Sequence, residues 1–166
     1  MSEILPNKLY LGSLYDVENI NWLLENNITD IISLASDIDF IGLTNLLEKN
    51  NINHHIFKIY DDSNENISEL FLTLFKIIDS ANIICVYCSF GISRSPTVII
   101  AYLMYKHKMF LDDATKFVLK SRNCIFPNDN FLMQLFKFEK ELFGLISFTH
   151  DKYGIAKYKN MIHSYK

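Results

Sequence analysis

The sequence lacks the features that mark membrane, secreted or disulfide-bonded proteins. No stretch approaches the roughly 18 consecutive apolar residues that a membrane-spanning helix needs. The start, MSEILPNKLY, has no charged segment followed by an apolar one, so we expect no signal peptide. The three cysteines are few and odd in number, which disfavours a disulfide framework. We therefore expect an intracellular protein, in the cytoplasm or also in the nucleus.

Strong charge, repeats and metal motifs are also missing. The net charge of −3 argues against a dedicated nucleic-acid binder, which would carry a basic face. The histidines at 54, 55 and 107 form no metal-ligand spacing, and no segment ends in the Gly-Lys-Ser/Thr of a nucleotide-binding P-loop. We expect no nucleic acid, no membrane partner, no metal and no cofactor.

Short apolar runs alternate with helical patterns along the 166 residues, which suffice for one domain with a single core. The run IICVY (83–87) is typical of a strand buried on both faces of a parallel sheet. The alternation predicts an α/β fold with a central, mostly parallel twisted sheet flanked by helices. The expected strands are a pair within 7–14, then 30–36, 53–59 and 83–87, and the expected helices are 17–27, 40–50, 67–81, 95–107, 111–122 and 128–143.

The last stretch differs in charge. Residues 144–166 hold four lysines and one aspartate, whereas residues 1–143 hold twelve basic and eighteen acidic residues. Apolar residues recur at helical spacing from Ile155 to Tyr165. We expect a domain over 1–143 and a basic, helical tail over 144–166 that packs on the core or on another subunit. A dimer through this tail, or a regulatory or targeting role, are the alternatives.

The stretch VYCSFGISRS (86–95) carries the chemistry. It leaves the buried strand for a helix, so it lies where ligands bind in open α/β sheets. Loop N–H groups and the helix N-terminus can point at one anion, Gly91 permits the turn, and Arg94 presents a fork for two phosphate oxygens. Cys88 in that positive field would be a nucleophile for phosphorus. The expected phosphate-binding residues are Ser89, Phe90, Gly91, Ile92, Ser93 and Arg94.

Two other interpretations of the cysteine are weaker. A buried cysteine is often only a small hydrophobic residue. Cys85 and Cys88 also spell a Cys-x-x-Cys redox pattern. Three extended residues of about 3.3 Å rise separate the two Cα atoms by about 10 Å, beyond the roughly 7 Å that a disulfide spans.

The same residues resemble the signature of the dual-specificity protein phosphatases, in the superfamily of cysteine-dependent tyrosine phosphatases. That signature is His-Cys-x-x-Gly-x-Ser-Arg-Ser, often followed by Pro-Thr. Here it reads Tyr87-Cys88-Ser89-Phe90-Gly91-Ile92-Ser93-Arg94-Ser95-Pro96-Thr97. The opening ILPNKLYLGSL, and later AYLM and PN..F..QL..FE..L, extend the similarity over about residues 3–143.

The resemblance implies hydrolysis of phosphotyrosine and phosphoserine or phosphothreonine in proteins through a cysteinyl-phosphate. Cys88 would attack, Arg94 would stabilise the phosphoryl group, and Ser95 would donate to the departing thiolate. Ser95 could also be a simple helix N-cap, and both roles can hold together. The family's general acid stands seven residues before a serine that opens a helix, which assigns Asp61 ahead of Ser68. Its neighbour Asp62 is the rival, and an exposed turn with no catalytic role is the third option.

Tyr87 departs from the signature histidine. Tyrosine offers one hydroxyl in place of two ring nitrogens and cannot become a cation. We expect the Cys88 thiolate to form less readily than is usual in the family, with weaker activity near neutral pH. A pseudophosphatase that binds phosphorylated partners is the alternative. The presence of the cysteine, Arg94 and Asp61 favours an enzyme.

The loop's variable positions bear on the substrate. Phe90 and Ile92 would present apolar walls, which favours a protein over an inositol lipid or an RNA end. The lysines and arginine at 106, 108, 116, 120 and 122 form either a solvated helical face or a docking patch for an acidic partner.

Overall fold

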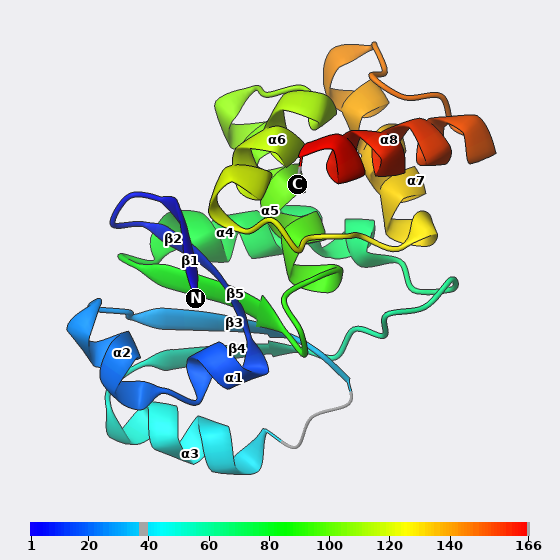
Figure 1. The fold of residues 1–166 in the computed structure, drawn as a ribbon. Helices are drawn as coiled ribbons and strands as arrows, with labels where there is room; N and C mark the ends of the chain where they lie inside the picture. Colours follow the sequence, from blue (N-terminus) through cyan, green and yellow to red (C-terminus); the bar gives the residue numbers. More distant parts are fainter. Residues whose placement is uncertain (37–39, 166) are drawn as a thin grey trace.

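A computed structural model of the chain describes residues 1–36 and 40–165. Within them, a five-stranded sheet in the order β1-β2-β5-β3-β4 has helices on both faces (Figure 1). The strand β1 is antiparallel to β2, and the other neighbours are parallel. The predicted α/β architecture is confirmed. The elements are β1 (Ser2–Leu5), β2 (Leu9–Ser13), α1 (Leu14–Val17), α2 (Ile20–Glu25), β3 (Asp30–Leu34), α3 (Ile41–Lys49), β4 (Asn53–Phe57), the 3₁₀ helix η1 (Ile67–Leu70), α4 (Phe71–Ser80), β5 (Ile84–Cys88), α5 (Arg94–His107), α6 (Leu111–Ser121), α7 (Asp129–Phe143) and α8 (Lys152–Tyr165).

Two predictions about the first 27 residues were wrong. The strand pair does not lie within 7–14, because β1 already begins at Ser2 and the hairpin turns at Asn7, whose φ is +52°. Asparagine tolerates this left-handed conformation better than most residues. The expected helix 17–27 is shorter, because the Asn19 side chain accepts a hydrogen bond from the N–H of Trp22 (3.2 Å) and caps the start of α2 at Ile20. A separate short helix, α1, ends at Val17.

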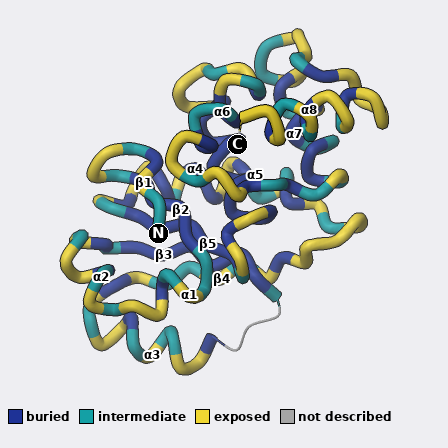
Figure 2. The backbone as a smooth tube through the Cα atoms, viewed as in Figure 1, coloured by how far each residue is buried: buried dark blue, intermediate teal, exposed yellow. Residues whose placement is uncertain are grey.

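The sheet separates two hydrophobic cores, and β5 is buried between them (Figure 2). The helices α4 to α8 cover one face, and α1 to α3 cover the other (Figure 1). Alternate side chains of a strand point to opposite faces. Val86 and Cys88 therefore enter the first core, whereas Cys85 and Tyr87 enter the second. All three cysteines are free.

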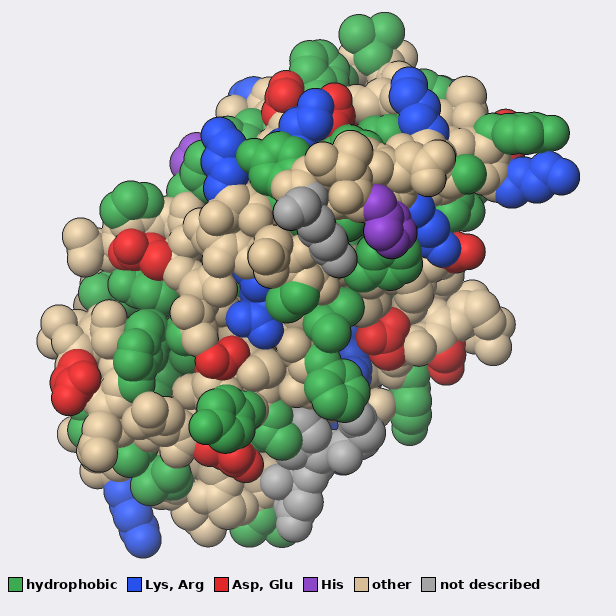
Figure 3. Space-filling model, viewed as in Figure 1, with side chains coloured by type: hydrophobic (Ala, Val, Ile, Leu, Met, Phe, Trp, Pro, Cys, Tyr) green, Lys and Arg blue, Asp and Glu red, His purple; other side chains and the backbone are tan. Residues whose placement is uncertain are grey.

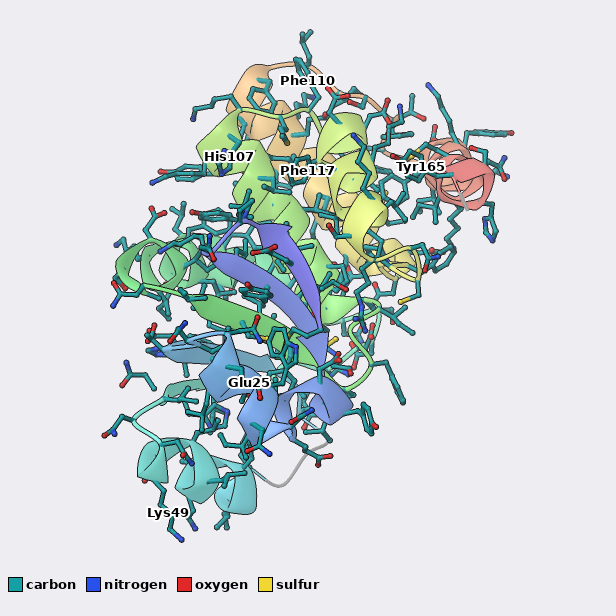
Figure 4. The ribbon with its side chains drawn as sticks, turned by 60° about the vertical axis from the view of Figure 1, so that its left-hand side comes forward. Glu25, Lys49, His107, Phe110, Phe117 and Tyr165 are labelled. Carbon is teal, nitrogen blue, oxygen red and sulfur yellow. The ribbon has the colours of Figure 1, made fainter. Side chains whose placement is uncertain are left out.

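The C-terminal helix α8 packs on the same chain. Tyr158 and Ile162 are fully buried, and the Tyr158 hydroxyl shares a 2.9 Å hydrogen bond with the hydroxyl of Thr115 in α6. In Figure 4, the helix that ends at Tyr165 lies beside α6. Among the described residues, none of the helices combines the length and apolar character needed to cross a membrane.

Candidate active site

Cys88 lies at the carboxyl end of β5, and its side chain is almost wholly buried. The Ser95 hydroxyl, in the first turn of α5, donates to the Cys88 sulfur at 3.2 Å. This hydroxyl is placed to donate to negative charge on the sulfur. The residue that caps α5 is Ser93, because the helix begins at Arg94. The alternative role of Ser95 as the N-cap is therefore wrong.

The backbone between Cys88 and α5 forms a cradle, and its hydrogen bonds show which way each peptide points. Four consecutive carbonyl oxygens are bonded to the surrounding scaffold: those of Ser89 (from Leu14 N, 3.2 Å), Phe90 (from Arg122 Nη2, 3.1 Å), Gly91 (from Arg122 Nε, 2.9 Å) and Ile92 (from Phe126 N, 2.6 Å). In a trans peptide the C=O and the next N–H point in opposite directions. The N–H groups of residues 90–93 therefore turn away from the scaffold, toward the inside of the loop, as in an anion-binding nest.

Gly91 makes this turn possible, with φ of +66°. A Cβ at this position would come within 2.6 Å of the Gly12 carbonyl oxygen and of Arg122 Nη2. No side chain fits there without moving backbone. The loop is thus pressed against β2 on one side and held by Arg122 on the other.

Arg122 is a residue whose role the sequence analysis missed. It was placed on a surface patch, but its side chain is only 14% exposed and lies 3.7 Å from Asp16 Oδ2 while it binds two loop carbonyls. The interpretation as a surface arginine was wrong, because the chain turns inward after α6. The sequence signal was no more than a basic residue at a helix end.

Arg94 is 4% exposed and spans the site. Its Nη1 donates to the carbonyl oxygen of Ile59 (3.0 Å), and its Nη2 donates to the Ser89 hydroxyl (2.9 Å). Its Nε lies 3.7 Å from Asp61 Oδ2. The guanidinium is fixed at the loop, in the place where a planar fork can meet phosphate oxygens.

The structure separates the two candidate acids. Asp61 Oδ1 accepts hydrogen bonds from the Ser93 hydroxyl (2.8 Å) and from Asn128 Nδ2 (2.6 Å), so this carboxyl lies at the cysteine loop. Asp62 Oδ1 instead accepts from the backbone N–H groups of Asn64 and Glu65 at 2.7 and 3.1 Å. Asp62 therefore stabilises its own turn, whereas Asp61 lies at the cysteine loop.

Asn128 is the second residue that the sequence analysis missed. Its Oδ1 caps α7 by accepting from the N–H of Phe131 (2.9 Å), while its Nδ2 binds Asp61 and its backbone N–H donates to the Ser93 hydroxyl (3.1 Å). One residue thus joins α7, the acid and the cysteine loop. An asparagine directly before a helical pattern is a cap signal that could have marked it.

Tyr87 lies on the opposite side of the sheet from the sulfur of Cys88 and is fully buried. Among the described residues, its hydroxyl has no hydrogen-bond partner of good geometry. Burial raises the pKa of Tyr87 well above its ordinary value, and the hydroxyl of Ser33, opposite it in β3, acts in the other direction. Ser33 is itself bonded to the ring of His54, whose pKa burial lowers to about 4, helped by the neighbouring charge of His55.

The mouth of the site is apolar and open. Phe90 is 73% exposed and Ile92 is 38% exposed. Among the described residues, no three His, Cys, Asp or Glu side chains are placed to hold a metal ion. Acidic and basic side chains are intermixed on the face in Figure 3. Of the predicted basic surface, Lys106 pairs with Asp79 (2.8 Å) and Lys116 with Asp112 (3.0 Å).

Comparison with known proteins shows which family the chain resembles. The family model for the catalytic domain of dual specificity phosphatases matches residues 9–141. The chain belongs to the dual specificity phosphatase family. It is 36% identical to MAP kinase phosphatase with leucine-rich repeats protein 1 of Dictyostelium discoideum over 143 residues, and 38% identical to human dual specificity protein phosphatase 9 over 145 residues.

These alignments cover 84% of this chain in both cases, but only 16% and 36% of the two relatives. Among solved structures, the human tyrosine phosphatase-like serine/threonine/tyrosine-interacting protein superposes with a TM-score of 0.72 at 29% identity. That superposition covers 85% of this chain and 96% of the human one. The similarity therefore concerns the catalytic fold, and the long relatives have further segments that this chain does not match.

Proposed function

We propose that the chain is an active phosphatase that hydrolyses phosphotyrosine, phosphoserine and phosphothreonine esters in proteins. The convergence at Cys88 supports this most directly. Its sulfur accepts from Ser95 at the floor of a loop whose N–H groups face inward, with Arg94 and Asp61 on the same side. Inward N–H groups and a guanidinium together match the oxygens of a phosphoryl group and the charge that develops on them.

The first step transfers the phosphoryl group to sulfur. The Cys88 thiolate attacks phosphorus, the S–P bond forms as the bond from phosphorus to the ester oxygen breaks, and Asp61 gives its proton to that oxygen. The oxygen leaves as a neutral hydroxyl. Ser93 and Asn128 hold the carboxyl for this transfer, because both donate to its Oδ1.

The second step hydrolyses the cysteinyl-phosphate and regenerates the free enzyme. Asp61, now a carboxylate, takes a proton from water as the water oxygen attacks phosphorus. The S–P bond breaks, inorganic phosphate forms, and Ser95 donates to the thiolate that departs. No step needs a metal or a redox cofactor, since protons and electrons balance within the cysteine, the aspartate and water.

The exposed residues at the opening of the active site support a substrate class. Exposed Phe90 and half-exposed Ile92 offer apolar contact beside the phosphate without enclosing it. An open rim accepts both the long phosphotyrosine and the shorter phosphoserine or phosphothreonine side chains. The names of the relatives, dual specificity and MAP kinase phosphatases, agree with phosphorylated proteins as substrates.

A second candidate is a module that binds phosphorylated proteins with little turnover. Tyr87 favours it, because its buried hydroxyl has no good partner among the described residues and cannot supply the support expected of the signature histidine. One structural relative is named as phosphatase-like and as an interacting protein. The intact set of Cys88, Arg94 and Asp61 favours the enzyme over this candidate.

The test is the hydrolysis of nitrophenyl phosphate between about pH 5 and about pH 8.5, with Cys88→Ser and Asp61→Asn as controls. We expect turnover that Cys88→Ser abolishes and that Asp61→Asn lowers with an altered pH profile. No turnover in the native chain, restored by Tyr87→His, would instead support the binding module. No turnover in either would rule out the enzyme.

A further inference from the structure

We propose that α8 is a positioning helix for the active site, in which Lys159 and His163 hold the segment 126–129, which is hydrogen-bonded to both the cysteine loop and the acid. This inference rests on the proposed phosphatase chemistry. The family model ends at residue 141, so α8 lies outside the matched catalytic domain. Its contacts reach the site by two routes.

The first route passes through Phe126. His163 lies edge-on to the Phe126 ring, with centroids 5.7 Å apart, and Lys159 Nζ lies 5.4 Å from the centroid of the same ring. The backbone N–H of Phe126 donates to the carbonyl oxygen of Ile92 at 2.6 Å. That hydrogen bond is one of the four that turn the loop N–H groups inward. Two side chains of α8 therefore fix a residue that shapes the phosphate cradle.

The second route passes through Asp129. Lys159 forms an ion pair with Asp129, the first residue of α7. The residue before it is Asn128, which donates to Asp61 Oδ1 at 2.6 Å and binds Ser93. The ion pair fixes the start of α7, and the start of α7 holds the acid. Lys159 thus belongs to both routes.

The helix is firmly docked, which gives these contacts a fixed base. Tyr158 and Ile162 are fully buried, and the Tyr158 hydroxyl is bonded to Thr115. At the other end, a Cβ on Gly154 would come 1.8 Å from the Thr149 carbonyl oxygen, so the helix start lies directly on the backbone before it. Residues on the exposed side of α8 can only reach Phe126 and Asp129 because of this anchoring.

The route through Asp129 has a consequence that is specific to the acid step. A displaced Asp61 weakens proton donation to the leaving oxygen. Phenolate is a poor leaving group and needs that proton, whereas nitrophenolate leaves with little help. Loss of α8 support should therefore lower kcat/KM for phenyl phosphate more than for nitrophenyl phosphate. A merely structural change would lower both alike.

The experiment compares Lys159→Met with Lys157→Met in the full chain. Lys157 is a matched control, because it lies on the same helix and over an aromatic ring, that of Phe148 at 5.5 Å. That ring packs against Phe136 and Tyr158. We expect Lys159→Met to lower kcat/KM for phenyl phosphate about fivefold and for nitrophenyl phosphate less than about twofold. Lys159→Arg should restore the value, and Lys157→Met should leave both substrates unchanged. Equal losses on both substrates, or no loss on either, would overturn the proposal.

His163→Leu tests the route through Phe126 on its own. We expect it to weaken competitive inhibition by inorganic phosphate about threefold, because the cradle loses support while Asp129 keeps its ion pair. Unchanged inhibition would remove this route.

Failure of the proposed function can be told from failure of this inference. If the native chain hydrolyses neither ester, the enzyme is disproved, and the rate of Cys88 alkylation in the presence of phosphate replaces turnover. Weaker protection by phosphate in Lys159→Met and not in Lys157→Met would still support α8 as a positioning helix. Equal protection in both variants would overturn it.

Discussion

The two faces of the sheet at the end of β5 treat adjacent residues very differently. On one face, Cys88 receives a hydrogen bond from Ser95 and sits beside a loop whose carbonyls are all engaged by the scaffold. On the other face, Tyr87 is packed among apolar side chains, and within the described part of the chain its hydroxyl has no partner of good geometry.

This difference separates the residues that would carry out the reaction from the buried residues that support them. The groups that would contact phosphate come from the loop, Arg94 and Asp61, whereas the Tyr87 side chain lies in the core on the other face of the sheet from the Cys88 side chain. Tyr87 is joined to Cys88 directly through the backbone of β5. We therefore infer that the exchange at position 87 tunes the site and does not dismantle it, and the predictions below test that division.

The largest effect is expected on the face of the sheet that carries the Cys88 side chain, from Arg94→Lys. A lysine cannot span Ile59, Ser89 and the phosphate at once, since its charge is a single point on a flexible stem. We expect kcat/KM for nitrophenyl phosphate to fall about 10²- to 10³-fold, with the melting temperature nearly unchanged. A loss below about tenfold would mean that the loop N–H groups alone carry the stabilisation.

The next effect compares two adjacent carboxylates. Asp61→Asn should lower turnover of phenyl phosphate about 10²-fold, because the amide has no proton of suitable acidity to donate. Asp62→Asn should lower it less than about threefold, since Asp62 only organises its own turn. Steady-state rates of the two variants, side by side, measure the contrast. Comparable losses in both would show that the acid loop, and not one carboxylate, controls proton transfer.

The sequence was informative where chemistry fixes spacing. A cysteine, a glycine and an arginine between a buried strand and a helix have few arrangements. The choice of Asp61 came instead from the family resemblance, through its register with Ser68, and Asp61 lies at the loop. Arg122 and Asn128 were missed because they fold back from far along the chain, 31 residues after Gly91 and 67 residues after Asp61. Such contacts depend on how helices pack, and local patterns do not encode them.

A smaller effect is expected on the face of the sheet that carries the Tyr87 side chain, from Tyr87→His. An imidazole offers two nitrogens for buried hydrogen bonds, and the Ser33 hydroxyl faces this position across the strand pair. We expect alkylation of Cys88 at neutral pH to become faster, with turnover near neutral pH rising a few-fold. Iodoacetamide rates of the two proteins measure the change. An unchanged alkylation rate would show that the residue before the cysteine does not influence its sulfur.

The smallest effect is expected from Tyr87→Phe, which removes only the hydroxyl. A buried hydroxyl without a good partner carries a desolvation cost of about 1–3 kcal/mol, part of which Ser33 offsets. The variant should therefore unfold at a temperature higher by about 2–4 °C, equivalent to about 1 kcal/mol in a domain of this size, with turnover unchanged. Urea denaturation gives the same quantity as a shift in midpoint at constant slope. A loss of stability would mean that the hydroxyl is bonded in solution, to Ser33 or to a buried water, and Tyr87 would then be an organised support that replaces the histidine by other means.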